Sequence, residues 1–226
     1  MSSEIFEIPL WAELLAASLG GLQGALFAAG MKDRRIDILG VMVVGIAVAL
    51  GGSLLRDVIL NQPPIVVWSS WYLVAASAAA LVGMAMQTFL RRIDWVVVVL
   101  DAVVIGTFGA IGATKALSLG VGEVGAVLVG IVGAVGGSIA RDLLLGLPVA
   151  FLQVGSLFVV AAGGGVGVLV ALVALDVPVT LAGIVCVVVT TIARLGAVRF
   201  DWKFPEQRPL QIPARRWVAR RTLKRG

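Results

Sequence analysis

The sequence is poor in the residues that build most catalytic and metal sites. It contains no histidine, so the commonest metal ligand and the usual acid–base group at neutral pH are missing. Cys186 is its one cysteine, which excludes a disulfide within the chain and a cysteine-rich zinc site. The sequence also lacks a Walker sequence and a recognisable pairing of nucleophile and base. We therefore expect neither an enzyme nor a bound cofactor.

Charged residues are scarce as well. They make up 14% of the chain, whereas about a quarter is usual in soluble domains. Hydrophobic residues make up 60%. Most of this chain must therefore lie where water is absent, which predicts an all-α membrane protein.

Long apolar segments follow one another along almost the whole chain. A transmembrane helix needs about 20 mostly apolar residues. Seven windows meet this requirement: residues 9–31, 37–60, 66–90, 94–117, 121–146, 152–175 and 178–198. The links between them are short and carry prolines or charges, so we predict seven transmembrane helices.

Lysine and arginine predict how these helices are oriented. Residues 199–226 contain nine of them and would form a basic tail behind the last helix. Cytoplasmic loops are enriched in Lys and Arg. With the tail in the cytoplasm and seven spans, the N-terminus lies outside the cell membrane, and the basic links at 32–35 and 91–92 also fall inside. We expect the tail to touch anionic lipid rather than nucleic acid.

Large aromatic side chains lie near the predicted ends of the spans or in the tail, as is typical of anchors at a membrane interface. They are Trp11, Trp68, Trp71, Tyr72, Trp95, Trp202 and Trp217.

One motif occurs twice. The string GGSLLRDVILNQP at residues 51–63 returns as GGSIARDLLLGLP at 136–148, an offset of 85 residues. From Gly21 to Pro63 the ungapped comparison gives 16 identities in 43 positions. Composition alone does not explain so long a shared string, so we infer an internal duplication.

The period of the duplication contains three spans. An odd number places the second copy in the membrane from the opposite side, which predicts inverted repeats. The predicted units are a first three-helix repeat at 1–93, an inverted repeat at 94–176, a seventh helix at 177–198 and a cytoplasmic tail at 199–226. Arg56 then lies toward the outer face, where the charge rule does not account for it, so its cause must be internal to the fold.

The glycine pairs of the motif admit two interpretations. Paired glycines weaken a helix and allow a kink or unwinding, which would expose a polar pathway between the second and fifth spans. Alternatively they allow close helix packing, with the Arg-Asp pair capping the helix end. The residues concerned are Gly51, Gly52, Ser53, Gly136, Gly137 and Ser138 at the pathway or kink.

Charges inside spans are the other candidates, because charge at membrane depth is costly and usually faces the protein interior. The candidates for a charged pathway or gate are Arg56, Asp57, Asp101, Lys115, Arg141 and Asp142. Adjacent residues on a helix do not face each other, so we expect Arg56 and Asp57 to bond to other groups. Asp101 has two open readings, a cation-pathway residue or a buried partner for an arginine. Lys115 lies near a span end, where an interfacial position is the alternative.

The doubled GGxxRDxxL string resembles that of the prokaryotic trimeric intracellular cation (TRIC) channels, which overlap a family described as bacterial glycine transporters. The resemblance covers nearly all of residues 9–198. It implies a homotrimer with one ion pathway per protomer, spans two and five kinked beside it, and potassium-like monovalent cations as the permeant ions. The Lys-Glu-Val type motif of animal members is absent from both repeats.

Two functions follow as hypotheses. The first is a passive channel for potassium or sodium ions. The second is a secondary transporter for glycine or another small solute, since inverted repeats with discontinuous helices equally suit alternating access.

Overall fold

The computed structural model describes residues 8–31, 35–90, 94–152 and 157–202. Within these ranges the chain is helical and has no strand. The helices are α1 (Leu10–Ala29), α2 (Ile38–Ile59), α3 (Ile65–Trp68), α4 (Ser70–Leu90), α5 (Asp94–Ser118), α6 (Glu123–Leu144), the 3₁₀ helix η1 (Ala150–Leu152), α7 (Phe158–Ala174) and α8 (Val179–Arg199).

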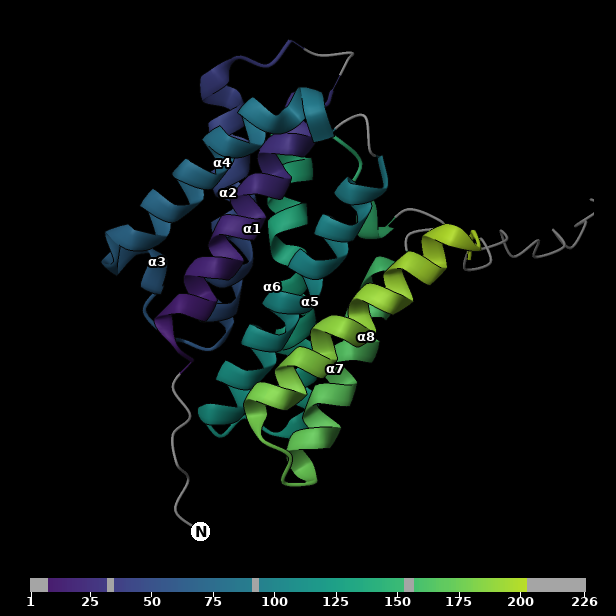
Figure 1. The fold of residues 1–226 in the computed structure, drawn as a ribbon. Coiled ribbons are helices and arrows are strands. Elements are labelled where there is room, and N and C mark those ends of the chain that lie inside the picture. The colour runs from purple at the N-terminus through teal and green to yellow at the C-terminus, as the bar shows by residue number, and fades with distance from the viewer. Residues whose placement is uncertain (1–7, 32–34, 91–93, 153–156, 203–226) are drawn as a thin grey trace, which may run out of the picture.

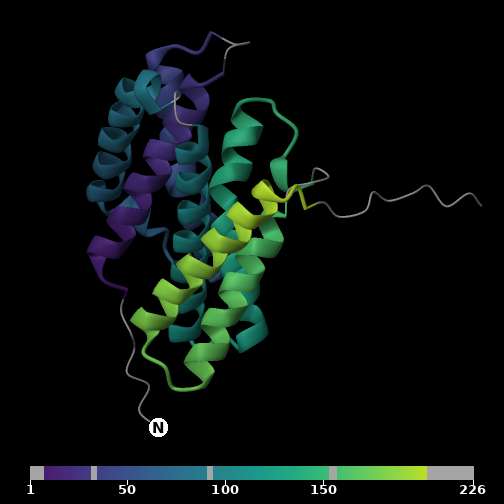
Figure 2. The same ribbon diagram turned by 45° about the vertical axis from the view of Figure 1, so that its right-hand side comes forward.

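The long helices alternate in direction through one bundle (Figure 1). In that view α1, α4, α6 and α8 rise, whereas α2, α5 and α7 descend. The triplet α1, α2 and α4 therefore runs opposite to the triplet α5, α6 and α7, and α8 lies outside both. Turned by 45°, α8 is seen crossing obliquely in front of α7 (Figure 2).

Six helices are long and apolar enough to cross a membrane: α1, α2, α4, α5, α6 and α8. The sixth predicted span is shorter than expected, because α7 has 17 residues. That length is at the lower end of the range of about 17–25 residues for a spanning helix. The all-helical prediction is confirmed. The short helices α3 and η1, each just after a copy of the motif, were not predicted.

The two copies of the motif end their helices in the same way. Leu60 N–H donates to the Arg56 carbonyl, and 85 residues later Leu145 N–H donates to the Arg141 carbonyl, both at 3.0 Å. The chain then turns with a positive φ, 51° at Asn61 and 58° at Gly146. Glycine and asparagine are the residues that tolerate this left-handed conformation, which explains their place in the two strings.

Helices α2 and α6 cross at the paired glycines. A Cβ added at Gly52 would collide with the Gly133 carbonyl, and one at Gly137 would collide with the Val48 carbonyl. These two contacts exchange under the 85-residue offset. At the crossing itself a Cβ on Gly51 would lie 3.3 Å from the Gly136 carbonyl oxygen. The glycines thus let two backbones touch, as small residues do in membrane bundles.

Both helices remain helical through their glycine pairs. The expectation that the chain unwinds there is therefore wrong. The backbone stays hydrogen-bonded because each glycine pair packs directly on the other, and nothing draws its N–H and C=O groups out of the helix.

The tryptophans at the predicted membrane interfaces are exposed on the bundle surface, from 53% at Trp202 to 80% at Trp68. Tyr72 differs, being only 2% exposed. Its assignment as an interfacial anchor is wrong, because its hydroxyl has a partner inside the bundle. Trp217 and the basic tail from residue 203 onward lie outside the described residues.

Candidate functional site

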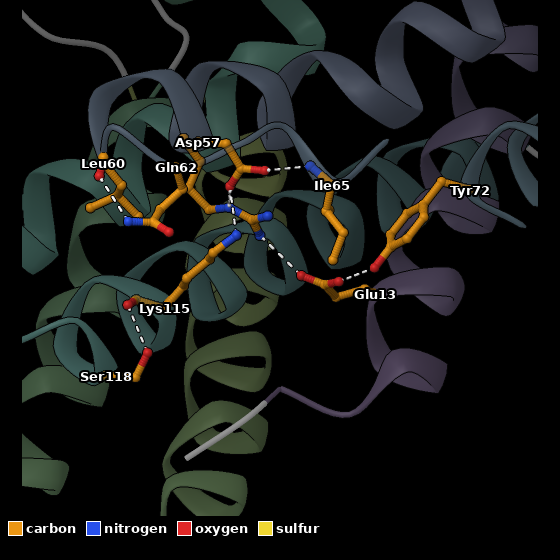
Figure 3. Close-up of polar contacts among 9 residues, drawn as sticks. Glu13, Asp57, Leu60, Gln62, Ile65, Tyr72, Lys115 and Ser118 are labelled. Atoms are coloured by element: carbon orange, nitrogen blue, oxygen red, sulfur yellow. Dashed lines mark hydrogen bonds and ion pairs between the residues drawn. The ribbon is translucent and has the colours of Figure 1, made fainter. Parts of the chain in front are cut away.

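The first copy of the motif builds a buried cluster of four charged side chains (Figure 3). Asp57 on α2 accepts from Arg56 Nε and from Lys115 Nζ, both at 2.8 Å. Arg56 Nη1 also lies 3.5 Å from a carboxylate oxygen of Glu13 on α1. Lys115 reaches Asp57 from α5, so the cluster joins the two helix triplets.

Neutral groups complete this cluster. The Tyr72 hydroxyl donates to the Glu13 carboxylate across to α4. The backbone N–H of Ile65, the first residue of α3, donates to the second Asp57 oxygen at 3.2 Å. The short helix α3 is thereby held against the end of α2.

Burial makes the first cluster energetically demanding. Arg56 is 2% exposed and Asp57 is fully buried. The two cations and two anions balance in formal charge, which is the arrangement that buried charge requires. Loss of one partner from a buried ion pair typically costs about 3–5 kcal/mol, since the other charge is left unpaired.

The expectation that Arg56 and Asp57 bond only to other groups is wrong in one respect. They do reach other elements, but they also bond to each other. The Arg56 side chain is long enough to turn back beside Asp57, and the Nε–H is the atom nearest to that carboxylate. The rule against neighbouring residues facing each other holds for short side chains better than for arginine.

The second copy repeats this core. Arg141 Nε lies 2.9 Å from an Asp142 oxygen. The Ala150 N–H donates to the other Asp142 oxygen at 2.8 Å, and Ala150 stands 85 residues after Ile65. Arg141 is 5% and Asp142 2% exposed. A guanidinium–carboxylate pair, fastened to the backbone that follows the turn, is the structural element common to both repeats.

The outer partners of the two clusters differ. At the offset of 85 residues, Glu13 corresponds to Val98 and Lys115 corresponds to Gly30. Arg141 therefore has neither partner of the first cluster. Its guanidinium instead stacks 3.9 Å from the centroid of the Phe27 ring.

Beside Arg141 a cavity of about 400 Å³ opens between α1, α5, α6 and α8. Asp101 of α5 lines it, accepts from Gln23 Nε2 at 3.0 Å and lies 3.8 Å from Arg194 Nη2. Both readings of Asp101 thus retain support, since it lines a cavity and faces an arginine.

The predicted site residues fall into these two regions. Arg56, Asp57 and Lys115 meet in the first cluster, and Arg141, Asp142 and Asp101 meet around the cavity. The glycine pairs lie between them at the α2–α6 crossing. Ser53 and Ser138, the residues after the glycine pairs, are buried.

Sequence reasoning missed Arg194 and gave no role to Glu13, Gln23 or Tyr72. The signal for Arg194 was its position five residues before the end of α8, which is inside a span and should have marked it. Glu13, by contrast, gave no signal of its partner, because its distance in sequence from Arg56 carries no information about packing. Among the described residues no group of three or more His, Cys, Asp or Glu is arranged to hold a metal ion.

The sequence model of the family described as "Glycine transporter" matches two segments, residues 10–88 and 98–174. These segments are the two helix triplets, and together they span more than half of the chain. The chain belongs to this family. Its double match agrees with the duplication read from the motif.

Curated relatives are bacterial membrane proteins. The UPF0126 inner membrane protein YadS of Escherichia coli K12 is 31% identical over 197 residues, covering 86% of this chain and 94% of the relative. The UPF0126 membrane protein YvgT of Bacillus subtilis is 27% identical, covering 82% and 90%. This family member is a multi-pass membrane protein.

Solved structures with the same fold are TRIC channels. One, from work on conductance through TRIC cation channels, is 27% identical, with a TM-score of 0.74 over 88% of this chain and 97% of that chain. The TRIC orthologue of Rhodobacter sphaeroides is 28% identical, with a TM-score of 0.73 over 84% and 97%. The resemblance to both families is confirmed, and these neighbours are channels rather than enzymes.

Proposed function

We propose that this protein is a channel for monovalent cations, with potassium as a permeant ion. The observation that carries the proposal is the match to two TRIC channels across 97% of their length. Buried charge supports it. A membrane scaffold has no need of two buried Arg-Asp pairs at the ends of crossing helices, whereas an ion pathway does.

The proposed pathway follows the interface of α2 and α6, which are the second and fifth predicted spans. Its constriction is the glycine crossing, where Gly51, Gly52, Gly136 and Gly137 leave no room between the backbones. Ser53 and Ser138 would line it once the helices separate. A bend of either helix at its glycines is the motion that the proposal requires.

The first cluster is the proposed gate. Lys115 ties Asp57 to α5, and Glu13 ties Arg56 to α1. Because these contacts join both triplets at one end of α2, the helix cannot move until at least one ion pair exchanges. The second Arg-Asp pair has no such tie from Glu13 or Lys115 counterparts, so that end of the pathway is the open one.

We further propose a homotrimer in the cell membrane, with one pathway in each protomer. The N-terminus lies outside and the tail 199–226 inside, where it contacts anionic lipid. The two triplets, within 1–93 and 94–176, form inverted repeats about an axis in the membrane plane. The reversed helix directions and the reciprocal glycine contacts support this relation.

A second candidate function is the transport of glycine or another small solute. The description of the matching family favours it, and so does a cavity lined by charges of both signs. A carrier would saturate with its solute, whereas a channel would pass cations without a saturable solute.

Purified protein in liposomes separates the two candidates. We expect a potassium gradient to drive rapid cation flux, measured with an entrapped fluorescent potassium indicator, and we expect labelled glycine to equilibrate no faster than in empty liposomes. Saturable glycine uptake without cation flux, at verified protein incorporation, would reject the channel in favour of the carrier.

A further inference from the structure

Asp101 and Arg194 form the loosest ion pair among the described residues. Their closest atoms are 3.8 Å apart, well beyond the 2.7–2.9 Å typical of a charge-assisted hydrogen bond. Both side chains line the cavity of about 400 Å³. The pair is therefore in contact with open space rather than sealed within the bundle.

The other carboxylates of the two regions are committed more fully. Asp57 has two cations at 2.8 Å and a backbone N–H. Asp142 has its arginine at 2.9 Å and a backbone N–H at 2.8 Å. Asp101 has one short contact, the 3.0 Å bond from the Gln23 amide. It is the carboxylate with the most coordinating capacity left.

Arg194 is equally uncommitted. Its Nε is buried and has no hydrogen-bond partner. The guanidinium carbon lies 5.5 Å from the centroid of the Phe158 ring, which also lines the cavity. An aromatic face within about 6 Å attracts a guanidinium. Arg194 therefore has a second seat to occupy when it leaves Asp101.

We propose that Asp101 and Gln23 form a monovalent-cation site in this cavity and that Arg194 is its tethered competitor. An entering cation takes the Asp101 carboxylate, the Gln23 amide turns to offer its oxygen, and Arg194 withdraws onto Phe158. Carboxylate and amide oxygens are ligands that hard cations prefer. Arg194 then sets how strongly the cavity attracts cations.

Position within the fold supports this assignment. Arg194 belongs to α8, outside the repeats, and the positions equivalent to Asp101 and Gln23 in the other triplet are Ala16 and Phe108. The site thus exists once per chain, at the end that lacks counterparts of Lys115 and Glu13. A single cation site at one end of a pathway would act as a vestibule.

The inference rests on the proposed channel function, so its test uses two readouts. The first is the melting temperature of the detergent-solubilised protein in KCl against choline chloride at equal ionic strength, since a cation that binds only the folded state stabilises it. The second is the potassium concentration that gives half-maximal flux in liposomes. The variants are Arg194→Gln, Asp101→Asn and both together, with Arg199→Gln as the control, because Arg199 is on the same helix and exposed.

We expect potassium to stabilise the wild type and the control equally. In Arg194→Gln the potassium concentration for half-maximal effect should fall by about fivefold, a modest coupling for side chains in contact. Asp101→Asn should abolish the stabilisation, and the double variant should behave like Asp101→Asn, because Arg194 acts only through Asp101.

Potassium stabilisation that persists in Asp101→Asn would overturn the site. An Arg194→Gln response identical to the control would overturn the role of Arg194. If the stabilisation follows the expected pattern but no variant conducts cations, the site stands and the proposed channel function fails.

Discussion

At the scale of single residues, the Arg56–Asp57 pair and its counterpart explain why charged residues occur inside so apolar a chain. Each guanidinium neutralises the carboxylate beside it, and that carboxylate accepts the first N–H of the segment that follows the turn, at Ile65 or Ala150. The pair therefore fixes the end of a transmembrane helix, and any role in ion passage is added to this structural one.

Arg56→Gln tests the structural part. The substitution leaves Asp57 with Lys115 alone and leaves Glu13 without its cation, so we expect the protein to lose about 3 kcal/mol of stability, as is usual when a buried ion pair is broken. Thermal unfolding in detergent, followed by circular dichroism, measures the effect. The exposed Arg199→Gln is the matched control, and equal melting temperatures for the two variants would contradict the account.

The sequence was sufficient to find the residues of the motif but not their partners. Duplication marked Arg56 and Arg141 because the same string is conserved within one chain by its own repetition. Glu13, Gln23 and Arg194 lie outside the repeated string, and their partners are 43, 78 and 93 positions away. Such pairing depends on how helices cross, which no local pattern specifies. Tyr72 was misassigned for the same reason, since a tyrosine near a span end has the same sequence context whether it faces lipid or a carboxylate.

At the scale of helices, the crossing of α2 and α6 is the element on which the fold depends. Sequence predicted that the paired glycines matter, and it left open whether they serve a break or a contact. The structure shows continuous helices whose backbones touch. Helix propensity could not decide this, because the contact that keeps the glycines helical comes from a distant part of the chain.

Alanine substitutions test the crossing. A methyl group at Gly52 or Gly137 meets a carbonyl of the opposite helix, so each helix must shift away. We expect each variant to lose about 1–3 kcal/mol, the usual effect of overpacking. Gly183→Ala on α8 is the control, because its Cβ would meet nothing within 4 Å. Similar losses in Gly52→Ala and Gly137→Ala are expected from their reciprocal contacts; a loss in only one would argue against the inverted relation.

At the scale of the whole molecule, an odd number of spans separates the two ends of the chain. The account places the α5–α6 loop outside the cell and the end of α8 inside. In a Cys186→Ala background, Gly122→Cys should react with a membrane-impermeant maleimide in intact cells, whereas Trp202→Cys should react only after permeabilisation. Both positions are exposed. The reverse labelling pattern would invert the proposed orientation and remove the charge-based argument for it.

The same scale decides the central claim, that the molecule conducts monovalent cations rather than carrying a solute. Single-channel recording in planar bilayers under bi-ionic conditions tests it most directly, with potassium on one side and sodium on the other and chloride on both. The account predicts discrete unitary currents whose reversal potential excludes chloride as the main carrier. Silence at all voltages from bilayers shown to contain the protein, with saturable glycine uptake by the same preparation, would contradict it.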